Sequence, residues 1–259
     1  MNRFYVTLPS NSSSEYYPDN TVARYTTKLA NKVELEGDWE VGLVEISFPS
    51  AVDNVVQDRC YYDIYFGDET MHRLLLPPSN YNCMETLVAA LYQEQYNVEG
   101  IEQLVVTFAY ESDDVSPHMG GKVSLHIADD VKVQFSGDLA LMLGLDKDVK
   151  YSGDSERFST SLNASSVHSV YVYCDVLEHV AVGDTRAPLL RIVDKPKNEQ
   201  DVNVHKIMNP ILYVPLQKKN FDTVEINMIT DDGIPMPFRS GKSFVVLEFR
   251  RSLHAYFGL

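Results

Sequence analysis

The chain has 259 residues, a formal net charge of −15 and 44% hydrophobic residues. That length suffices for one large β domain or two smaller domains. A surface with this much negative charge repels phosphate backbones, and free nucleic acid is therefore a poor partner. The charge serves either solubility or docking on a basic surface. Sixteen Tyr and eleven Phe beside a single Trp favour sheets over helices.

The cysteines and the start of the chain bear on the compartment. Cys60, Cys83 and Cys174 are an odd number without a close pair, which disfavours a disulfide framework or a zinc cluster and indicates a reducing compartment. The opening MNRFYVTLPS lacks the apolar core of a signal peptide, and no window has the length of a membrane span. We therefore expect no membrane span, and we interpret the sequons at Asn11 and Asn163 as chance matches.

Alternating apolar residues predict strands throughout the first 76 residues. These strands cover residues 4–8, 21–35, 39–48, 61–66 and 71–76. In the third of them the apolar parity changes after Leu43, which predicts a bulge or burial of both faces. The polar loop 11–20 carries Tyr16 and Tyr17, and it is either a recognition loop or a plain connector.

Residues 77–166 have a mixed pattern, which predicts an α+β insertion with an exposed loop. A helix is expected to begin near Cys83, with a cap from residues 79–82, and a second short helix to be capped by Ser136 and to end at Gly144. Strands are expected at 104–109, 123–127 and 131–135, the last two as a hairpin through a turn at Asp129–Asp130. Residues 147–166 are polar and predict the exposed loop.

Strand patterns return after residue 167. The expected strands are 169–176, 188–193, 211–216, 223–228 and 243–249, with a charged connector at 194–201 and a turn at 231–233. The strand 223–228 has one wet face, whereas 243–249 is apolar on both parities, as in a strand packed on both faces. These features predict a mainly β, antiparallel, two-sheet core. The pair Arg250–Arg251 either contacts an acidic neighbouring subunit or ends the strand in water.

The sequence offers no catalytic constellation. The seven histidines lack metal-site spacing, and there is no nucleophile elbow, Walker loop or dinucleotide fingerprint. The glycines of Gly120–Gly121 and Gly241–Lys242 are too few to cradle phosphate. Pairs of aspartates at 113–114, 129–130 and 231–232 are candidates for acid–base or calcium chemistry, but they lie between strands, where Asp is a common turn residue. We therefore predict no enzyme activity and no catalytic, cofactor-binding or metal-binding residue.

Four blocks carry a family resemblance. They are FYVTLPSNSSSEYYPDNTVARYTTKLANKVELEGDWEVGLVEISFPS from residue 4, SGDLALMLGL at 136–145, VYVYCDVLEHVAVGDTRAPLLRIV at 170–193 and NFDTVEINMITDDGIPMPFRSGKSFVVLEFR at 220–250. In order along nearly the whole chain, they resemble the minor capsid (penton) protein of Polinton, or Maverick, elements and the related adintoviruses.

This resemblance implies a jelly-roll sandwich and a structural role without catalysis. It implies a homopentamer at each icosahedral vertex, contacts to the double-jelly-roll major capsid protein, and a location in the virion after synthesis in the host cytoplasm or nucleus. We expect the sandwich to comprise residues 1–76 and 167–259, with 77–166 inserted. Residues 1–20 are expected to make contacts beside or beneath the ring without being needed for folding.

Two other function classes remain open. One is a β-sandwich binding module that recognises glycans or host proteins through the insertion. The other is an enzyme on a β-sandwich scaffold, which requires convergent histidines and carboxylates that the sequence places far apart.

Overall fold

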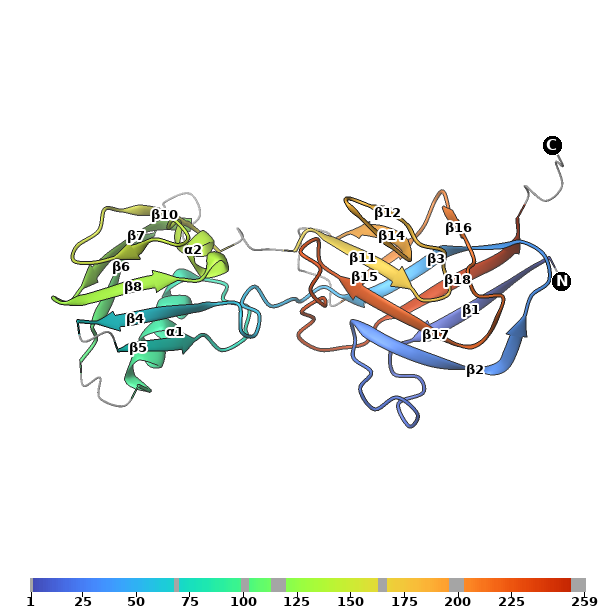
Figure 1. Cartoon of the computed structure of the whole chain (residues 1–259), viewed down its shortest axis with the longest axis horizontal. Coiled ribbons are helices and arrows are strands. Elements are labelled where there is room, and N and C mark those ends of the chain that lie inside the picture. The colour runs from blue at the N-terminus through green and yellow to red at the C-terminus, as the bar shows by residue number, and fades with distance from the viewer. Residues whose placement is uncertain are drawn as a thin grey trace. The chain divides into compact units, whose positions relative to one another are not determined.

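The chain folds into two compact units in the computed structural model, which describes residues 2–67, 70–98, 103–112, 120–162, 167–195 and 203–252 (Figure 1). The first unit comprises Met1–Val52 and Val167–Leu259, and the second comprises Asp53–Ser166. Each unit has a hydrophobic core of its own.

The first unit is a sandwich of two antiparallel sheets, with strand orders β1-β18-β3-β15, where β16 also pairs with β3, and β14-β11-β17-β2. The first sheet consists of β1 (Arg3–Pro9), β3 (Trp39–Pro49), β15 (Asn203–Ile207), β16 (Tyr213–Pro215) and β18 (Phe244–Arg251). The second consists of β2 (Arg24–Glu34), β11 (Ser169–Cys174), β14 (Leu189–Asp194) and β17 (Asn220–Ile229). A hairpin of β12 (Val180–Val182) and β13 (Thr185–Ala187) lies in the connection from β11 to β14.

The strand pairing is nested. β1 pairs with β18, β2 with β17, β3 with β15, and β11 with β14, all antiparallel. Leaving aside the short strands β12, β13 and β16, these pairs join the first strand of the sandwich to the last, the second to the next-to-last, and so on. This arrangement over two sheets is a jelly roll, which confirms the predicted fold class, and the second unit enters between β3 and β11.

The core lies between the two sheets because apolar residues alternate along each strand. In β17, Val224, Ile226 and Met228 are fully buried, as the period of two predicts. Tyr25 of β2 is also buried, and its hydroxyl donates to the Leu8 carbonyl of β1 at 3.1 Å. That bond joins the two sheets and gives the buried phenol a partner.

A bulge in β3 explains the change of apolar parity. The register between β3 and β18 shifts so that Val246 lies opposite Glu45 while Leu247 lies opposite Leu43, which leaves Val44 as the extra residue. Leu43 and Ile46 therefore both face the core and are buried, although they differ in parity. The predicted bulge is confirmed.

The expectation that residues 1–20 are unnecessary for folding is wrong. β1 is an edge strand whose Leu8 is fully buried and whose Phe4 ring stacks on Phe249 at 4.9 Å. The loop that follows is held against β2, because the Lys28 amide donates to Ser13 Oγ at 3.0 Å and the Asn20 side-chain amide donates to the Thr26 carbonyl at 2.9 Å. Deleting this segment would remove part of the core.

The described residues of the second unit form two antiparallel sheets and two helices. The sheets have the orders β5-β4-β8-β9 and β10-β7-β6. Their strands are β4 (Tyr61–Phe66), β5 (Met71–Leu75), β6 (Val106–Ser112), β7 (Gly120–Ile127), β8 (Val131–Phe135), β9 (Lys150–Tyr151) and β10 (Phe158–Ser161), and the helices are α1 (Met84–Tyr96) and α2 (Gly137–Leu143). The buried Gln95 fixes the end of α1 to β6, because its side-chain oxygen accepts from the Val106 amide at 3.0 Å and its nitrogen donates to the Val106 carbonyl at 2.9 Å.

The structure corrects the predicted boundary between the units. Residues 53–76 belong to the second unit, because Tyr62 of β4 pairs with Phe135 of β8 and both side chains lie in the second core. Alternation had identified β4 and β5 correctly as strands. It gives no information about which sheet a strand joins, and the sequence division therefore placed them in the sandwich.

Two further expectations in this unit are corrected. β7 pairs with β6 and β10, whereas β8 pairs with β4 and β9, so the strands on either side of Asp129–Asp130 diverge into different sheets rather than forming a hairpin. The segment 147–166 contains β9 and β10, and is therefore not simply a loop. Both errors arise because alternation does not identify the partner of a strand, and β8 and β10 pair with β4 and β7, which lie farther away in the sequence.

The helix ends are partly as predicted. α1 begins at Met84, close to the expected start, but its N-cap is Cys83 rather than a residue of 79–82. Neither Cys83 nor Ser136 makes a side-chain cap bond. Instead, the Ser136 hydroxyl accepts from the Tyr61 amide at 3.1 Å. Gly144 ends α2 in the left-handed conformation at φ 71°, and the Leu145 amide donates to the Ala140 carbonyl at 2.8 Å, which confirms the predicted helix stop.

Some predicted features lie outside the described residues. They are Asp113–Asp114, Asn163, two of the seven histidines (His118 and His254) and most of the connector 194–201.

Candidate interaction site

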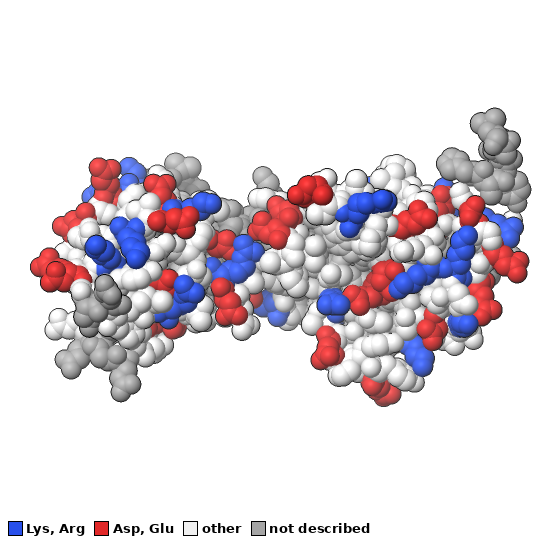
Figure 2. Space-filling model, in the orientation of Figure 1, with Lys and Arg blue, Asp and Glu red and all other residues white. Residues whose placement is uncertain are grey.

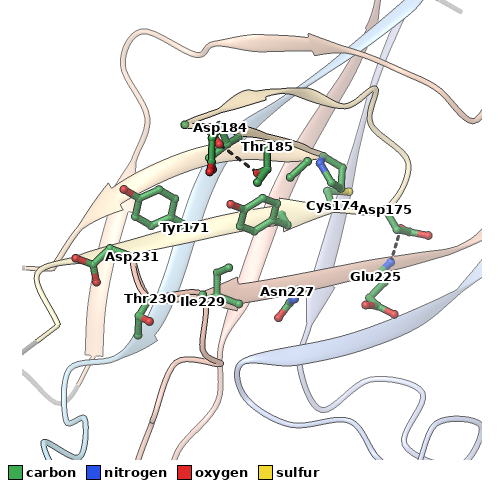
Figure 3. A pocket seen from close by; sticks show the side chains of 16 residues that line it. Tyr171, Cys174, Asp175, Asp184, Thr185, Glu225, Asn227, Ile229, Thr230 and Asp231 are labelled. Atoms are coloured by element: carbon green, nitrogen blue, oxygen red, sulfur yellow. Dashed lines mark hydrogen bonds between the residues drawn. The ribbon is translucent and has the colours of Figure 1, made fainter. Parts of the chain in front are cut away.

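A groove of about 700 Å³ lies on the outer face of the β11–β17 sheet in the sandwich (Figure 3). Its floor is formed by side chains that alternate with the core residues of the same strands: Tyr171 and Tyr173 from β11, and Asn227 and Ile229 from β17. The period of two that buries one face of each strand therefore presents two tyrosines and an isoleucine on the other.

The β12–β13 hairpin forms a wall of this groove. Val182 pairs with Thr185 across a two-residue turn, Gly183–Asp184, and Gly183 has a φ of 61°. A two-residue hairpin turn requires such a left-handed residue, which glycine adopts without steric cost. The turn places Asp184 at the groove, and the turn that follows β17 contributes Asp231. In Figure 3, Tyr171 lies between Asp184 and Asp231.

Among the described residues that line the groove, all the charged ones are acidic: Asp175, Asp184, Glu225 and Asp231. Two of them are neutralised, since Lys218 Nζ lies 2.6 Å from Asp175 and Arg24 Nε lies 3.0 Å from Glu225. Asp184 and Asp231 have no ion-pair partner among the described residues. One part of the groove therefore combines a tyrosine ring with two uncompensated carboxylates.

The groove tyrosines are partly covered. Burial, with a smaller contribution from Tyr171, raises the pKa of Tyr173, so the phenol stays protonated and presents an aromatic face and a hydroxyl. Figure 2 shows this side of the sandwich unit with a largely uncharged middle, bordered by acidic and basic side chains.

The outer face of the other sheet carries a charged cluster centred on Glu248. This carboxylate is nearly buried, with its side chain 4% exposed, and Arg3 Nε lies 3.3 Å from it. The Tyr213 hydroxyl donates to the same carboxylate at 3.1 Å. Burial, followed by that hydrogen bond, raises the pKa of Tyr213.

Both residues of the Arg250–Arg251 pair contact their own chain. Arg250 Nε donates to Glu40 at 2.6 Å, and its guanidinium lies 3.3 Å from the centre of the Tyr213 ring. Arg251 donates to the Glu36 carbonyl at 3.3 Å. Arg250 therefore does not simply end the strand in water, because it is paired within its own sheet.

The two edges of this sheet expose apolar side chains that the sequence analysis did not single out. Tyr5 on the edge strand β1 is 52% exposed, and on the opposite side Ile207 of β15 is 71% exposed and Leu212 is 55% exposed. Ile207 lies in a strand that was not predicted. Its neighbours Val204 and His205 alternate too briefly to indicate one.

The other residues considered in the sequence lie apart. His205 contacts Glu45 at 2.6 Å and His126 contacts Asp154, each as an isolated pair. The described part of the chain holds no group of three or more His, Cys, Asp or Glu side chains placed to bind a metal ion. In the described ranges, no helix is long and apolar enough to cross a membrane.

Tyr16 of the N-terminal loop is 63% exposed beneath the Lys28 ammonium, which lies 4.6 Å from its ring centre.

Comparison with known proteins yields matches among the solved structures. No family model matches the sequence, and no curated protein matches it. Among solved structures, the chain is similar to one described as the crystal structure of SeMet-labeled mavirus penton protein. The TM-score is 0.45 at 10% sequence identity, and the alignment covers 96% of this chain and 99% of that chain.

Proposed function

We propose that the protein is a structural capsid protein of the penton kind, which forms homopentamers at the vertices of an icosahedral virion and contacts a double-jelly-roll major capsid protein. One observation carries the proposal. Three of the four blocks that resemble the Polinton and adintovirus penton proteins fall on the strands of one jelly roll, namely β1 to β3, β11 to β14, and β17 to β18. The protein acts through its shape, and we assign it no catalytic residue.

A head-to-tail interface is the contact that this sandwich suits. In such a ring, one flank of each copy packs against the opposite flank of its neighbour. Tyr5 lies on one edge of the β1-β18-β3-β15 sheet, and Ile207 and Leu212 lie at the other. Interface centres are enriched in aromatic and apolar side chains, so we place the ring contact between these two edges.

This interface can be tested by placing negative charges on the edge of the sheet that carries Ile207 and Leu212. Replacing Ile207 and Leu212 together by Asp should convert a pentamer to a monomer without unfolding it, because both side chains are exposed in the single copy. Ile192→Asp is the control, since Ile192 is also exposed at 44% but lies on the other sheet. Light scattering after size-exclusion chromatography measures the mass. A pentamer that persists in the double variant would refute this interface.

The groove favours a second candidate function, a binding module. Its tyrosine floor suits a sugar ring or a peptide, although it lies on the sandwich rather than on the insertion, where such a site was expected. A chain that remains monomeric at high concentration and binds a neutral oligosaccharide would support this alternative. Negative-stain images with five-fold rings would support the capsid proposal.

A further inference from the structure

We propose that the groove on the β11–β17 face docks an extended, arginine- or lysine-bearing segment of a partner protein. This inference goes beyond the proposed function and does not depend on the ring, because the groove lies on the sheet opposite to the one whose edges we assign to the ring contact.

The first argument is charge. Sixteen of the described residues line the groove; four of them carry carboxylates, and none of the sixteen is Lys, Arg or His. The salt bridges to Lys218 and Arg24 leave Asp184 and Asp231 uncompensated among the described residues. Arg186, on the hairpin itself, donates to the His179 carbonyl at 2.7 Å and does not line the groove. A cationic ligand is thus the complement of this surface, and the net charge of −15 attracts it from a distance.

The second argument is the aromatic floor. Tyr171, Asp184 and Asp231 line the same groove, and Figure 3 draws Tyr171 between the two carboxylates. The groove therefore offers a cationic side chain both carboxylates and an aromatic ring. Cation–π contact and charge-assisted hydrogen bonds act on the same group in this arrangement. Arginine fits it best, because its planar guanidinium stacks on a ring and donates several hydrogen bonds at once.

The third argument is shape. The groove follows the sheet face between the β12–β13 hairpin and the turn after β17, with Tyr173, Asn227 and Ile229 along its floor. Such an open trough admits an extended chain, whose alternate side chains would contact the floor. The partly apolar floor gives the aliphatic stem of Arg or Lys a surface to pack on.

The test uses the full chain and a defined probe. The probe is a fluorescein-labelled peptide, Gly-Ser-Arg-Ser-Arg-Ser-Gly, and its matched control carries citrulline in place of both arginines. Fluorescence anisotropy at low salt should show binding of the arginine peptide and at least about tenfold weaker binding of the citrulline peptide.

Variants then locate the site. The double change Asp184→Asn and Asp231→Asn should weaken binding about tenfold or more, since it removes both free carboxylates. Asp19→Asn with Asp222→Asn is the control, because it changes the net charge equally at exposed positions outside the groove. Tyr171→Ala should also weaken binding, whereas Tyr171→Phe, which keeps the ring, should restore it. Thermal unfolding verifies that each variant is folded.

Several outcomes would overturn the proposal. They are equal affinity of the two double variants, no binding to the wild-type chain at about 1 mM peptide, and equal binding of the arginine and citrulline peptides. Displacement of the peptide by maltotriose would identify the groove as a glycan site instead. Self-association that the double change at Asp184 and Asp231 abolishes would identify a second copy as the occupant.

Discussion

At the residue scale, Gly144 shows how one position fixes the end of a helix. Its φ of 71° is left-handed, and a Cβ added there would collide with the backbone of Ser159 on β10. The glycine therefore serves both the turn and the close approach of a neighbouring strand. Sequence alone predicted the turn, but the contact with β10 could not be predicted, because β10 was not expected to exist.

We predict that Gly144→Ala destabilises the second unit by about 3 kcal/mol, from left-handed strain together with the backbone clash. Gly137→Ala, at the start of the same helix, is the matched control. No atom lies within 4 Å of its added Cβ, so its effect should be within about 0.5 kcal/mol. Urea unfolding measures both, and equal effects of the two changes would contradict this role of Gly144.

The cysteines differ in reactivity at the same scale. Burial raises the pKa of Cys60 and of Cys174 to about 12, whereas Cys83 is partly exposed. The thiolate is the reactive form, so we predict that Ellman's reagent at pH 8 modifies Cys83 rapidly and the other two only after unfolding. Rapid reaction of two or three thiols in the folded chain would be inconsistent with this core.

The raised pKa values of Cys60 and Cys174 also make the stability of the folded chain depend on pH. In the unfolded chain the two thiols have the ordinary cysteine pKa of 9.0, whereas burial raises the pKa of each to about 12 in the folded chain. Above pH 9 the unfolded state therefore loses protons that the folded state retains, and stability falls as pH rises from 9 towards 12. Below pH 9 these two groups should make no pH-dependent contribution.

At the scale of elements, the bulge in β3 determines which residues face the core. Val44 is the extra residue, so Leu43 and Ile46 share the inner face. The sequence already contained this information as a change of parity. It did not reveal that β18 supplies the pairing that accommodates the bulge, since residues 50–243 separate the two strands.

We predict that Ile46→Ala destabilises the sandwich by about 3 kcal/mol, because Ile46 is fully buried. Val44→Ala should cost less than about 1 kcal/mol, because Val44 lies on the outer side of the bulge and is only partly covered. Chemical denaturation compares the two. The reverse order of the two effects would mean that the bulge lies elsewhere in the strand.

The candidate groove was only partly predictable for a similar reason. Tyr171 and Tyr173 lie in a strand that alternation predicted, and Asp231 lies in a predicted turn. The wall does not follow from the pattern, because β12 and β13 are three residues each and pair only with one another. Short paired segments of this kind have too few alternating positions to be distinguished from a loop.

At the scale of the whole chain, the two units have separate hydrophobic cores. The jelly roll is assembled from the two ends of the sequence, and residues 53–166 bury their own apolar side chains. Strand patterns predicted a two-sheet β core and an inserted α+β segment. The nested order of the eight sandwich strands was not predictable from them, because it is set by contacts between distant segments.

The central claim is that the chain works by assembling with copies of itself. Sedimentation velocity on the purified full chain, at concentrations up to about 1 mM, tests it most directly. We predict a discrete species of about 147 kDa, five times the 29.4 kDa chain, which the Ile207→Asp, Leu212→Asp double variant dissociates. A single 29.4 kDa species throughout that range would contradict the claim.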